Sequence, residues 1–290
     1  MQKFKTKIIF PIFISHAGCP FQCIFCDQNH ITNQSVGAMS SSPVKSEVAI
    51  EWDIIIPQVQ KFVDKTNEYK EIAFFGGTFT CLSEKEMLAH FLKFKGVIDD
   101  NTYFRISTRP DAINSDILNF LKSQKVNTIE LGIQSFSDKE LSASKRGYDA
   151  VKAISACEQI KQYDFNLCVQ LLIGLPQANN DTFNQSINSL KTLKPDYARL
   201  YPLIVLKDTI LEQMYRKGDY KPLSIEEATE ICATFYQMCD NYGINVIKMG
   251  LHGNISKDKI VAGPYHERFG ELVKNLCLRN KEIRVCTKNS

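Results

Sequence analysis

The sequence lacks several features that mark specialised classes of protein. Its 290 residues contain no apolar stretch long enough to span a bilayer, no low-complexity linker and no internal repeat. The net charge is only +3 and the basic residues form no concentrated stripe, so the composition does not indicate a dedicated nucleic-acid-binding protein. Nothing resembles a Ser-His-Asp arrangement, a P-loop or a pair of hydrolytic carboxylates. With 44% hydrophobic residues, the chain can bury a large core in one barrel-sized domain or two smaller ones.

The ten cysteines do not have the regular spacing of a small disulfide-linked protein. Three are clustered near the N-terminus, and the other seven are expected to be small buried hydrophobic residues: Cys81, Cys157, Cys168, Cys232, Cys239, Cys277 and Cys286. This usage is typical of a reducing cytosol, so we expect a cytoplasmic protein.

The first residues have a weak likeness to a signal peptide, because lysines precede the apolar run Ile8–Ile14 and Ala17-Gly18-Cys19 resembles a lipoprotein cleavage site. The run is short and broken by Pro11, and His16 stands where a small apolar residue would be expected. A signal peptide would also leave the next two cysteines unexplained. We therefore do not expect one.

Apolar, β-branched runs alternate with amphipathic stretches along most of the chain. The predicted strands are Ile8–Ile14, Ile72–Phe75, Tyr103–Ser107, Thr128–Ile133, Leu167–Ile173 and Tyr197–Leu203. The predicted helices are Val44–Thr66, Ser83–Lys95, Ser115–Ser123, Ala150–Gln162 and Thr182–Leu193. This alternation indicates parallel strands covered by helices, and six such units make most of an eight-unit barrel. The expected fold class is therefore α/β, an incomplete (β/α)6 TIM-like barrel.

Helix boundaries are marked by Ser83 and Ser224, each followed by glutamates, and by Gly218 and Gly243 at helix ends. The segment 208–242 is predicted to form two helices and Ile244–Met249 a further strand. Residues 1–250 are therefore expected to form the barrel core with its C-terminal helices. Residues 251–290 are expected to be a tail that packs on the barrel or is partly loose.

The main chemical signal is the segment Cys19-Pro20-Phe21-Gln22-Cys23-Ile24-Phe25-Cys26, which directly follows the first predicted strand. It therefore lies at the carboxyl end of that strand, where barrel enzymes place their sites. Three thiolates fit three irons of a 4Fe-4S cluster, which normally takes four cysteines, so one iron would be open to another ligand. Zinc or redox-active thiols are alternatives, although zinc sites favour separated Cys-x2-Cys pairs and bacterial ferredoxins have two-residue gaps throughout.

The Cys-x3-Cys-x-aromatic-Cys pattern resembles the radical S-adenosylmethionine (radical SAM) superfamily. This resemblance implies a 4Fe-4S cluster held by Cys19, Cys23 and Cys26, with S-adenosyl-L-methionine on the open iron. It also implies cleavage of that cofactor to methionine and a 5′-deoxyadenosyl radical, and a barrel of the radical SAM type. Phe25 would lie against the adenine.

Further motifs at successive strand ends strengthen the resemblance. Gly76-Gly77-Thr78 resembles the motif that binds the methionine amine, with Thr78 as in oxygen-independent coproporphyrinogen oxidases. Gln134, Arg146 and the strand exit Ile173-Gly174-Leu175-Pro176 resemble other positions that hold the cofactor. Taken separately, the two glycines mark only a tight turn and Gly-x-Pro an ordinary strand exit.

The end of the third predicted strand, Ser107-Thr108-Arg109-Pro110-Asp111, resembles the catalytic subunit of Elongator, a tRNA wobble-uridine modifying enzyme. Ser107 and Arg109 are therefore candidate cofactor-binding residues, although an acid commonly stands where Ser107 is and Arg109 fits an ordinary ion pair equally well. The resemblance continues through Arg199-Leu200-Tyr201-Pro202 and Gly218–Pro222. The cysteine spacing differs and the acetyltransferase domain of Elongator is absent, so acyl transfer is not expected.

The leading hypothesis is a radical enzyme that abstracts hydrogen from a substrate, and the resemblance to Elongator favours a tRNA base. The resemblance to coproporphyrinogen oxidases allows a porphyrin or another small molecule, and the fold alone does not decide. The alternatives are a non-catalytic or electron-transfer iron–sulfur protein and a zinc-binding RNA module. A donor such as flavodoxin or ferredoxin is expected to supply the electron.

His16 and His30 could lie near the cluster, whereas His252 and Trp52 are expected to be structural.

Overall fold

The computed structural model describes residues 8–14, 17–26, 50–250 and 255–286, with the backbone alone for residues 280–286. His16, His30 and His252 lie outside these residues, as does the first part of the helix predicted from Val44. Ile50 and Glu51 are not helical, and the helix α1 begins at Trp52, later than predicted.

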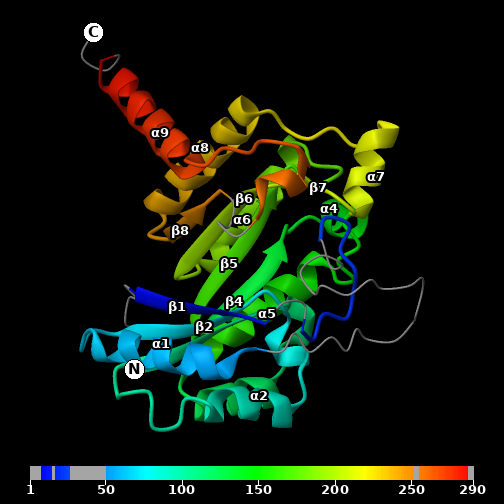
Figure 1. Cartoon of the computed structure of the whole chain (residues 1–290). Helices are drawn as coiled ribbons and strands as arrows, with labels where there is room; N and C mark the ends of the chain where they lie inside the picture. Colours follow the sequence, from blue (N-terminus) through cyan, green and yellow to red (C-terminus); the bar gives the residue numbers. More distant parts are fainter. Residues whose placement is uncertain (1–7, 15–16, 27–49, 251–254, 287–290) are drawn as a thin grey trace. The chain divides into compact units, whose positions relative to one another are not determined.

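Seven of the described strands form one sheet in the order β1-β2-β3-β4-β5-β6-β8 (Figure 1). Their bounds are Ile8–Phe13, Lys70–Phe75, Thr102–Thr108, Val126–Gln134, Asn166–Ile173, Tyr197–Pro202 and Asn245–Met249. The pairings β1–β2, β2–β3, β3–β4 and β6–β8 are parallel, which requires a crossover between the strands that are paired. All seven predicted strands are therefore confirmed, with small differences at their ends.

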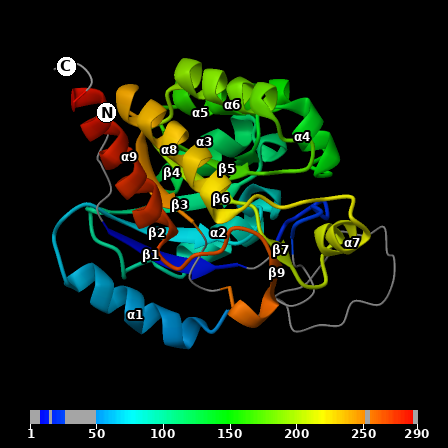
Figure 2. The ribbon, with the colours of Figure 1, turned by 90° about the horizontal axis from the view of Figure 1, so that it is seen from above.

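The chain divides into two compact units, of which the first comprises Met1–Phe21, Gln28–Gly132 and Ser155–Cys168. Its helices are α1 (Trp52–Asp64), α2 (Glu84–Leu92), α3 (Ser115–Ser123) and most of α5 (Ala150–Gln162). Every residue of β2 is buried, and α1 and α2 lie beside β1 and β2 (Figures 1 and 2). The helix α2 begins with a capping box in which Ser83 and Glu86 exchange hydrogen bonds, as its sequence predicted.

Aromatic side chains join the helices to the strands in this unit. The rings of Phe91 on α2 and Phe104 on β3 are 4.8 Å apart, and Phe74 on β2 lies 5.0 Å from Phe79. Trp52 on α1 contacts His90 and Phe94, which agrees with the packing role expected for it. These contacts pack α2 against β2 and β3 and join α1 to α2.

The strands of the first unit also carry a buried network of charges. The Nε and Nη2 atoms of Arg105 donate to Oε2 of Glu130 at 3.2 and 3.0 Å, and its Nη1 lies 3.4 Å from Oε2 of Glu71. Thr128 donates to the other oxygen of Glu71 at 2.5 Å. All of these side chains are buried, so the ion pairs are shielded from water.

The second unit comprises Gln22–Asp27, Ile133–Ile154 and Val169–Ser290. Its helices are α4 (Asp138–Ala143), α6 (Asn180–Leu193), α7 (Ile210–Lys217), α8 (Ile225–Asn241) and α9 (Phe269–Cys286). The two helices predicted between residues 208 and 242 are confirmed as α7 and α8, and α7 ends at Gly218 with φ +81°. The short strands β7 (Val205–Leu206) and β9 (Ile260–Ala262) form a separate antiparallel pair.

The helix α9 lies along α8 and contacts β8 (Figures 1 and 2). Phe269 and Val273 on α9 are buried, and the thiol of Cys277 lies 3.7 Å from the carbonyl oxygen of Ala233 on α8. Part of the segment predicted as a tail is therefore a packed helix. Among the described helices, none has the length and apolar character needed to cross a bilayer.

Candidate functional site

In the first unit, the loop after β1 is bound to the segment that follows β2. The backbone nitrogen of Ile14 donates to the carbonyl oxygen of Phe75 at 2.8 Å. The backbone nitrogen of Thr78 donates to the carbonyl oxygen of Ala17, also at 2.8 Å. A Cβ atom on Gly77 would lie 2.5 Å from the same carbonyl oxygen, closer than atoms can approach. A glycine is therefore required at position 77, because the two backbone segments touch there.

Thr78 contacts the first predicted cluster ligand. Its side chain is 1% exposed, and its Oγ1 lies 3.4 Å from the sulfur of Cys19. Gly76, two residues earlier, has φ +89° and Gly18 has φ +74°, values that favour glycine. The predicted motif Gly76-Gly77-Thr78 is thus brought against the cysteine loop, and its role in binding the cofactor stays a prediction.

Arg109, at the exit of β3, is held by two neighbours. Its Nε and Nη2 atoms donate to the two carboxylate oxygens of Asp111, each at 2.9 Å. Its guanidinium also lies 4.8 Å from the centre of the Phe21 ring, within the cysteine segment. Arg109 therefore forms the ion pair that was expected as one of its two roles. It also contacts the cysteine loop through its cation–π interaction with Phe21. Ser107 is half-buried on the same strand.

In the second unit, the sulfur of Cys23 accepts a hydrogen bond from Nη1 of Arg146 at 2.9 Å. Both residues are buried, at 7% and 5% exposure. The other guanidinium nitrogens, Nε and Nη2, donate to the hydroxyl of Tyr148 at 3.0 and 2.9 Å. Burial would lower the pKa of Arg146, but Tyr148 and Cys23 raise it above its usual value. The arginine is therefore a permanent cation next to a predicted iron ligand.

Ile24 and Phe25, between the second and third cysteines, anchor the loop. Ile24 is buried with Leu175, Leu203, Val205, Leu211 and Tyr220, and Phe25 packs against this cluster. The backbone nitrogen of Leu211 donates to the carbonyl oxygen of Ile24 at 2.9 Å. Phe25 thus lies against an apolar cluster that includes Leu175 of the β5 exit. Its predicted contact with the adenine stays a prediction.

Gln134, the last residue of β4, has φ +71°, which is unusual for a residue other than glycine. Its side chain is 7% exposed, and its Oε1 accepts no hydrogen bond within the described part of the chain. It lines a cavity of about 230 Å³ together with Ile173, Gly174 and Glu140. A buried acceptor of this kind is costly unless a donor reaches it, so a bound molecule with N–H or O–H groups would satisfy it.

The exit of β5 forms another wall of this cavity. Gly174 has φ +87°, and its carbonyl oxygen accepts a hydrogen bond from the hydroxyl of Tyr220 at 2.7 Å. The carbonyl oxygen of Ile173 accepts from the backbone of Leu203 at 2.8 Å, and Pro176 is buried just beyond. The structure therefore brings Gln134 and Ile173 together, as the motifs predicted, whereas Pro176 does not line the cavity.

The sequence analysis did not predict a role for two residues that contact or lie near the candidate site residues. Glu140 on α4 is 6% exposed and accepts a hydrogen bond from Thr182 at 2.6 Å, and burial raises the pKa of its carboxyl group. Tyr148 orients Arg146 and donates to the carbonyl oxygen of Ile133 at 2.8 Å. Glu140 has no sequence signal of its own, because its partner Thr182 is distant in the chain. Tyr148 stands in the turn Arg146-Gly147-Tyr148 that resembles the superfamily, but its contact with Ile133 has no local signal.

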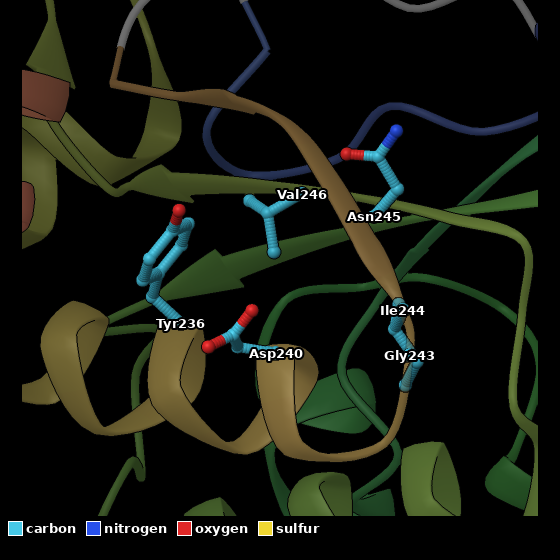
Figure 3. A pocket seen from close by; sticks show the side chains of 6 residues that line it. All are labelled: Tyr236, Asp240, Gly243, Ile244, Asn245 and Val246. Atoms are coloured by element: carbon cyan, nitrogen blue, oxygen red, sulfur yellow. The ribbon is translucent and has the colours of Figure 1, made fainter.

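A further cavity of about 200 Å³ lies between α8 and β8. Figure 3 shows Tyr236 and Asp240 extending from α8, with Asn245 and Val246 on the facing strand. No residue predicted for the site lies in it.

The three cysteines are divided between the units, with Cys19 in the first and Cys23 and Cys26 in the second. Among the described residues, no three His, Cys, Asp or Glu side chains form a group that could hold a metal ion. The chemistry of the donor set nevertheless fits an iron–sulfur cluster: the sulfur of Cys23 accepts from a cation, and that of Cys19 contacts a hydroxyl group. Ligation by these cysteines stays a prediction.

Comparison with known proteins identifies the family. Residues 13–190 match the Radical SAM superfamily, and this segment includes every predicted site residue. The chain belongs to the radical SAM superfamily. Residues 195–277 match the Radical_SAM C-terminal domain. Membership brings the two cofactors of this enzyme superfamily, a 4Fe-4S cluster and S-adenosylmethionine, and the incomplete parallel barrel of its fold, as predicted.

Relatives of this chain have different names. An uncharacterized protein of Methanocaldococcus jannaschii is 28% identical, over 89% of this chain and 78% of its own length. The tRNA uridine(34) acetyltransferase of the same organism is 24% identical, over 94% of this chain but 57% of its own length. The heme chaperone HemW of Bacillus subtilis is 27% identical, over 81% of this chain and 58% of its own. The chain thus spans little more than half of the last two relatives.

Solved structures of radical SAM proteins share the fold. The archaeal Elp3 of Methanocaldococcus infernus aligns with a TM-score of 0.69 and 18% identity, over 96% of this chain and 64% of its own. Coproporphyrinogen III oxidase (HemN) of Escherichia coli aligns with a TM-score of 0.59 and 17% identity, over 83% and 54%. The resemblance to both groups is confirmed, and neither matched domain is an acetyltransferase.

Proposed function

We propose that this chain is a radical SAM enzyme in which Cys19, Cys23 and Cys26 hold a 4Fe-4S cluster and the strand exits hold S-adenosylmethionine. When bound, these cofactors supply a carbon-centred radical that abstracts a hydrogen atom from a substrate. The family match over residues 13–190 carries the proposal, because it spans the three cysteines and every predicted cofactor-binding residue in one segment.

The side chains divide this work among them. Arg146 donates a hydrogen bond to the sulfur of Cys23, and the hydroxyl group of Thr78 contacts the sulfur of Cys19. Gln134 would accept a hydrogen bond from the cofactor, since its buried Oε1 has no donor in the described part of the chain. Ile173 gives the cavity an apolar wall that excludes water. Gly76, Gly77 and Pro176 would shape the backbone around the cofactor, and Phe25 would pack on it.

Anaerobic reconstitution tests the class of reaction. The purified protein should bind about four irons per chain and, with a strong reductant, convert S-adenosylmethionine to 5′-deoxyadenosine. Cys23→Ala should lose both properties. The matched control is Cys157→Ala, which removes a buried thiol from α5 and should keep both. A wild-type protein that binds one zinc and no iron would refute the proposal.

For the substrate, we propose a uridine of tRNA. The relative named tRNA uridine(34) acetyltransferase is 24% identical to this chain over 94% of this chain's length, which supports this substrate class. Deletion of the gene should remove a modified uridine from tRNA, as measured by mass spectrometry of nucleosides. Complementation with the wild-type gene, but not with Cys23→Ala, should restore it. An unchanged nucleoside profile would count against tRNA.

A non-catalytic role is the second candidate, because a relative over 81% of this chain is named a heme chaperone. In that case the protein should bind haem with a change in its Soret absorbance and should release no 5′-deoxyadenosine. Formation of 5′-deoxyadenosine without haem binding would reject this candidate. For the enzyme, the electron would come from a donor such as flavodoxin or ferredoxin. A reducing cytoplasm suits the scattered cysteines. Cys81, which was expected to be buried, is exposed, whereas the expectation of burial holds for Cys157, Cys168, Cys232, Cys239 and Cys277.

A further inference from the structure

The contact between Arg146 and Cys23 is fixed from both sides. Arg146 follows α4, and its backbone nitrogen donates to the carbonyl oxygen of Leu141 at 3.0 Å. On the side of the cysteine loop, the backbone nitrogen of Ile24 lies 3.4 Å from the carbonyl oxygen of Ser144. These bonds hold the segment that carries the cation next to the segment that carries the sulfur.

Tyr148 fixes the orientation of the guanidinium. Two of its three nitrogen atoms, Nε and Nη2, donate to the same hydroxyl group, which itself donates to the carbonyl oxygen of Ile133 at 2.8 Å. Because the guanidinium is planar, fixing one edge also sets the direction of the remaining nitrogen. That nitrogen, Nη1, lies 2.9 Å from the sulfur of Cys23. The hydroxyl thus acts on the sulfur through the arginine.

A cation that donates a hydrogen bond to a ligating cysteine sulfur changes the free energy of reducing the cluster by one electron. Hydrogen bonds to the sulfur ligands and buried charge are among the factors that set the reduction potential of an iron–sulfur cluster. The reduced cluster carries one more negative charge than the oxidised cluster, so a neighbouring cation stabilises the reduced form more. Burial increases this difference, because little water screens the pair. Here the cation is 5% exposed.

We propose that Tyr148 is a positioning residue that holds Arg146 on the sulfur of Cys23 and thereby raises the reduction potential of the cluster. This inference rests on the proposed function, since it needs the cluster on Cys23. The affected step is the transfer of one electron from a low-potential donor, which is oxidised by one electron while no bond forms or breaks. Arg146 has this role toward the sulfur in addition to any contact with the bound cofactor.

The test is a redox titration of the reconstituted protein, followed by electron paramagnetic resonance, without S-adenosylmethionine. Arg146→Gln should lower the equilibrium constant for reduction about tenfold, which is about 59 mV for one electron. Tyr148→Phe keeps the cation but removes the hydroxyl group that orients it, so it should shift the potential in the same direction by a smaller amount. Arg146→Lys, which retains charge without the planar fork, should fall between wild type and Arg146→Gln.

Lys145→Gln is the matched control, because it removes an exposed cation one residue away and should leave the potential unchanged. Iron content is measured for every variant. If Arg146→Gln loses its iron, Tyr148→Phe decides the question. A fully loaded Tyr148→Phe with the wild-type potential would overturn the inference. Failure of the wild-type protein to load iron would instead overturn the proposed function, so the two results are distinct.

Discussion

At the scale of single residues, the site depends on positions where a side chain is forbidden or oriented. Gly77 allows the segment after β2 to touch the loop after β1, since a Cβ atom would lie 2.5 Å from the carbonyl oxygen of Ala17 and 2.8 Å from that of Ile14. Both obstacles are backbone atoms, which cannot move independently of the loop that carries Cys19. The requirement for glycine is therefore steric and links the backbone directly to a predicted iron ligand.

Gly77→Ala should displace the loop and destabilise the protein by about 1–3 kcal/mol, together with a loss of iron loading. Urea denaturation and iron analysis measure the two effects. The matched control is Gly270→Ala on α9, where the nearest atoms are 3.4 Å away or farther and a helix favours alanine. Equal iron contents for the two variants would contradict the steric explanation.

Several residue roles could be predicted from the sequence and others could not. Glycines, cysteines and strand exits have local signals, so the sequence analysis could propose site residues in both units, and their roles stay predictions. The bond from Arg146 to Cys23 joins residues 123 positions apart, and its geometry is set by Tyr148 and Ile133, whose contribution no local pattern indicates. The role of Arg109 was also ambiguous from the sequence, because the sequence does not say whether the side chain of Asp111 faces it.

At the scale of elements, the strands were predictable because they lie in a parallel sheet, where buried runs rich in β-branched residues stand out. Helices with capping residues, such as α2 and α8, were equally clear. The short elements α4, β7 and β9 were missed, since two to six residues carry too little periodicity. The charges inside the strands were also missed as a network, because their pairing depends on strand register.

Arg105→Ala would leave Glu71 and Glu130 buried without their shared cation. Breaking a buried ion pair leaves the remaining charge without a partner in a site away from water. The variant should therefore lose about 3–5 kcal/mol of stability. The control is Arg216→Ala on α7, which breaks an exposed pair with Glu212 and should cost about 0.5 kcal/mol or less. Chemical denaturation of both variants measures the difference. Similar losses of stability in the two variants would show that burial does not increase the energetic cost of removing Arg105.

His90 on α2 gives the first unit a dependence on pH. It lies 5.6 Å from the rings of both Trp52 and Phe74, and burial lowers its pKa below 6.5, an effect that Lys93 reinforces and Glu86 opposes. The folded state therefore binds the proton less well than the unfolded state. The resulting stability is present above pH 6.5 and is lost as the pH falls through the lowered pKa.

His90→Phe keeps the ring but cannot be protonated. The variant should therefore lose less thermal stability than wild type between pH 7.5 and about pH 5, as measured by the midpoint of thermal denaturation at each pH. Parallel curves for the two proteins over this range would show that His90 is not the responsible group.

At the scale of the whole molecule, the described chain ends in a helix that the sequence indicated only as a tail. The helix α9 has weak apolar periodicity, and it packs along α8 and against β8. Phe269 is 2% exposed, and its side chain fills the space beside Gly250, where a Cβ atom would meet it at 2.9 Å. Residues 195–277, which match the C-terminal domain of the superfamily, include these contacts. They connect α9 to the end of β8, which is a strand of the seven-stranded sheet.

If α9 is part of the cooperative fold, Phe269→Ala should lower the free energy of unfolding by about 3–5 kcal/mol, because a buried aromatic ring is lost and a cavity remains. Leu278→Ala on the same helix is the control, since this side chain is 60% exposed and its removal should cost less than about 0.5 kcal/mol. Urea denaturation followed by circular dichroism measures both. A helix that unfolds separately would leave the main transition of Phe269→Ala at the wild-type midpoint, with an early loss of signal in its place. In that case the contact between Phe269 and Gly250 would stabilise only the docked helix and not the sheet.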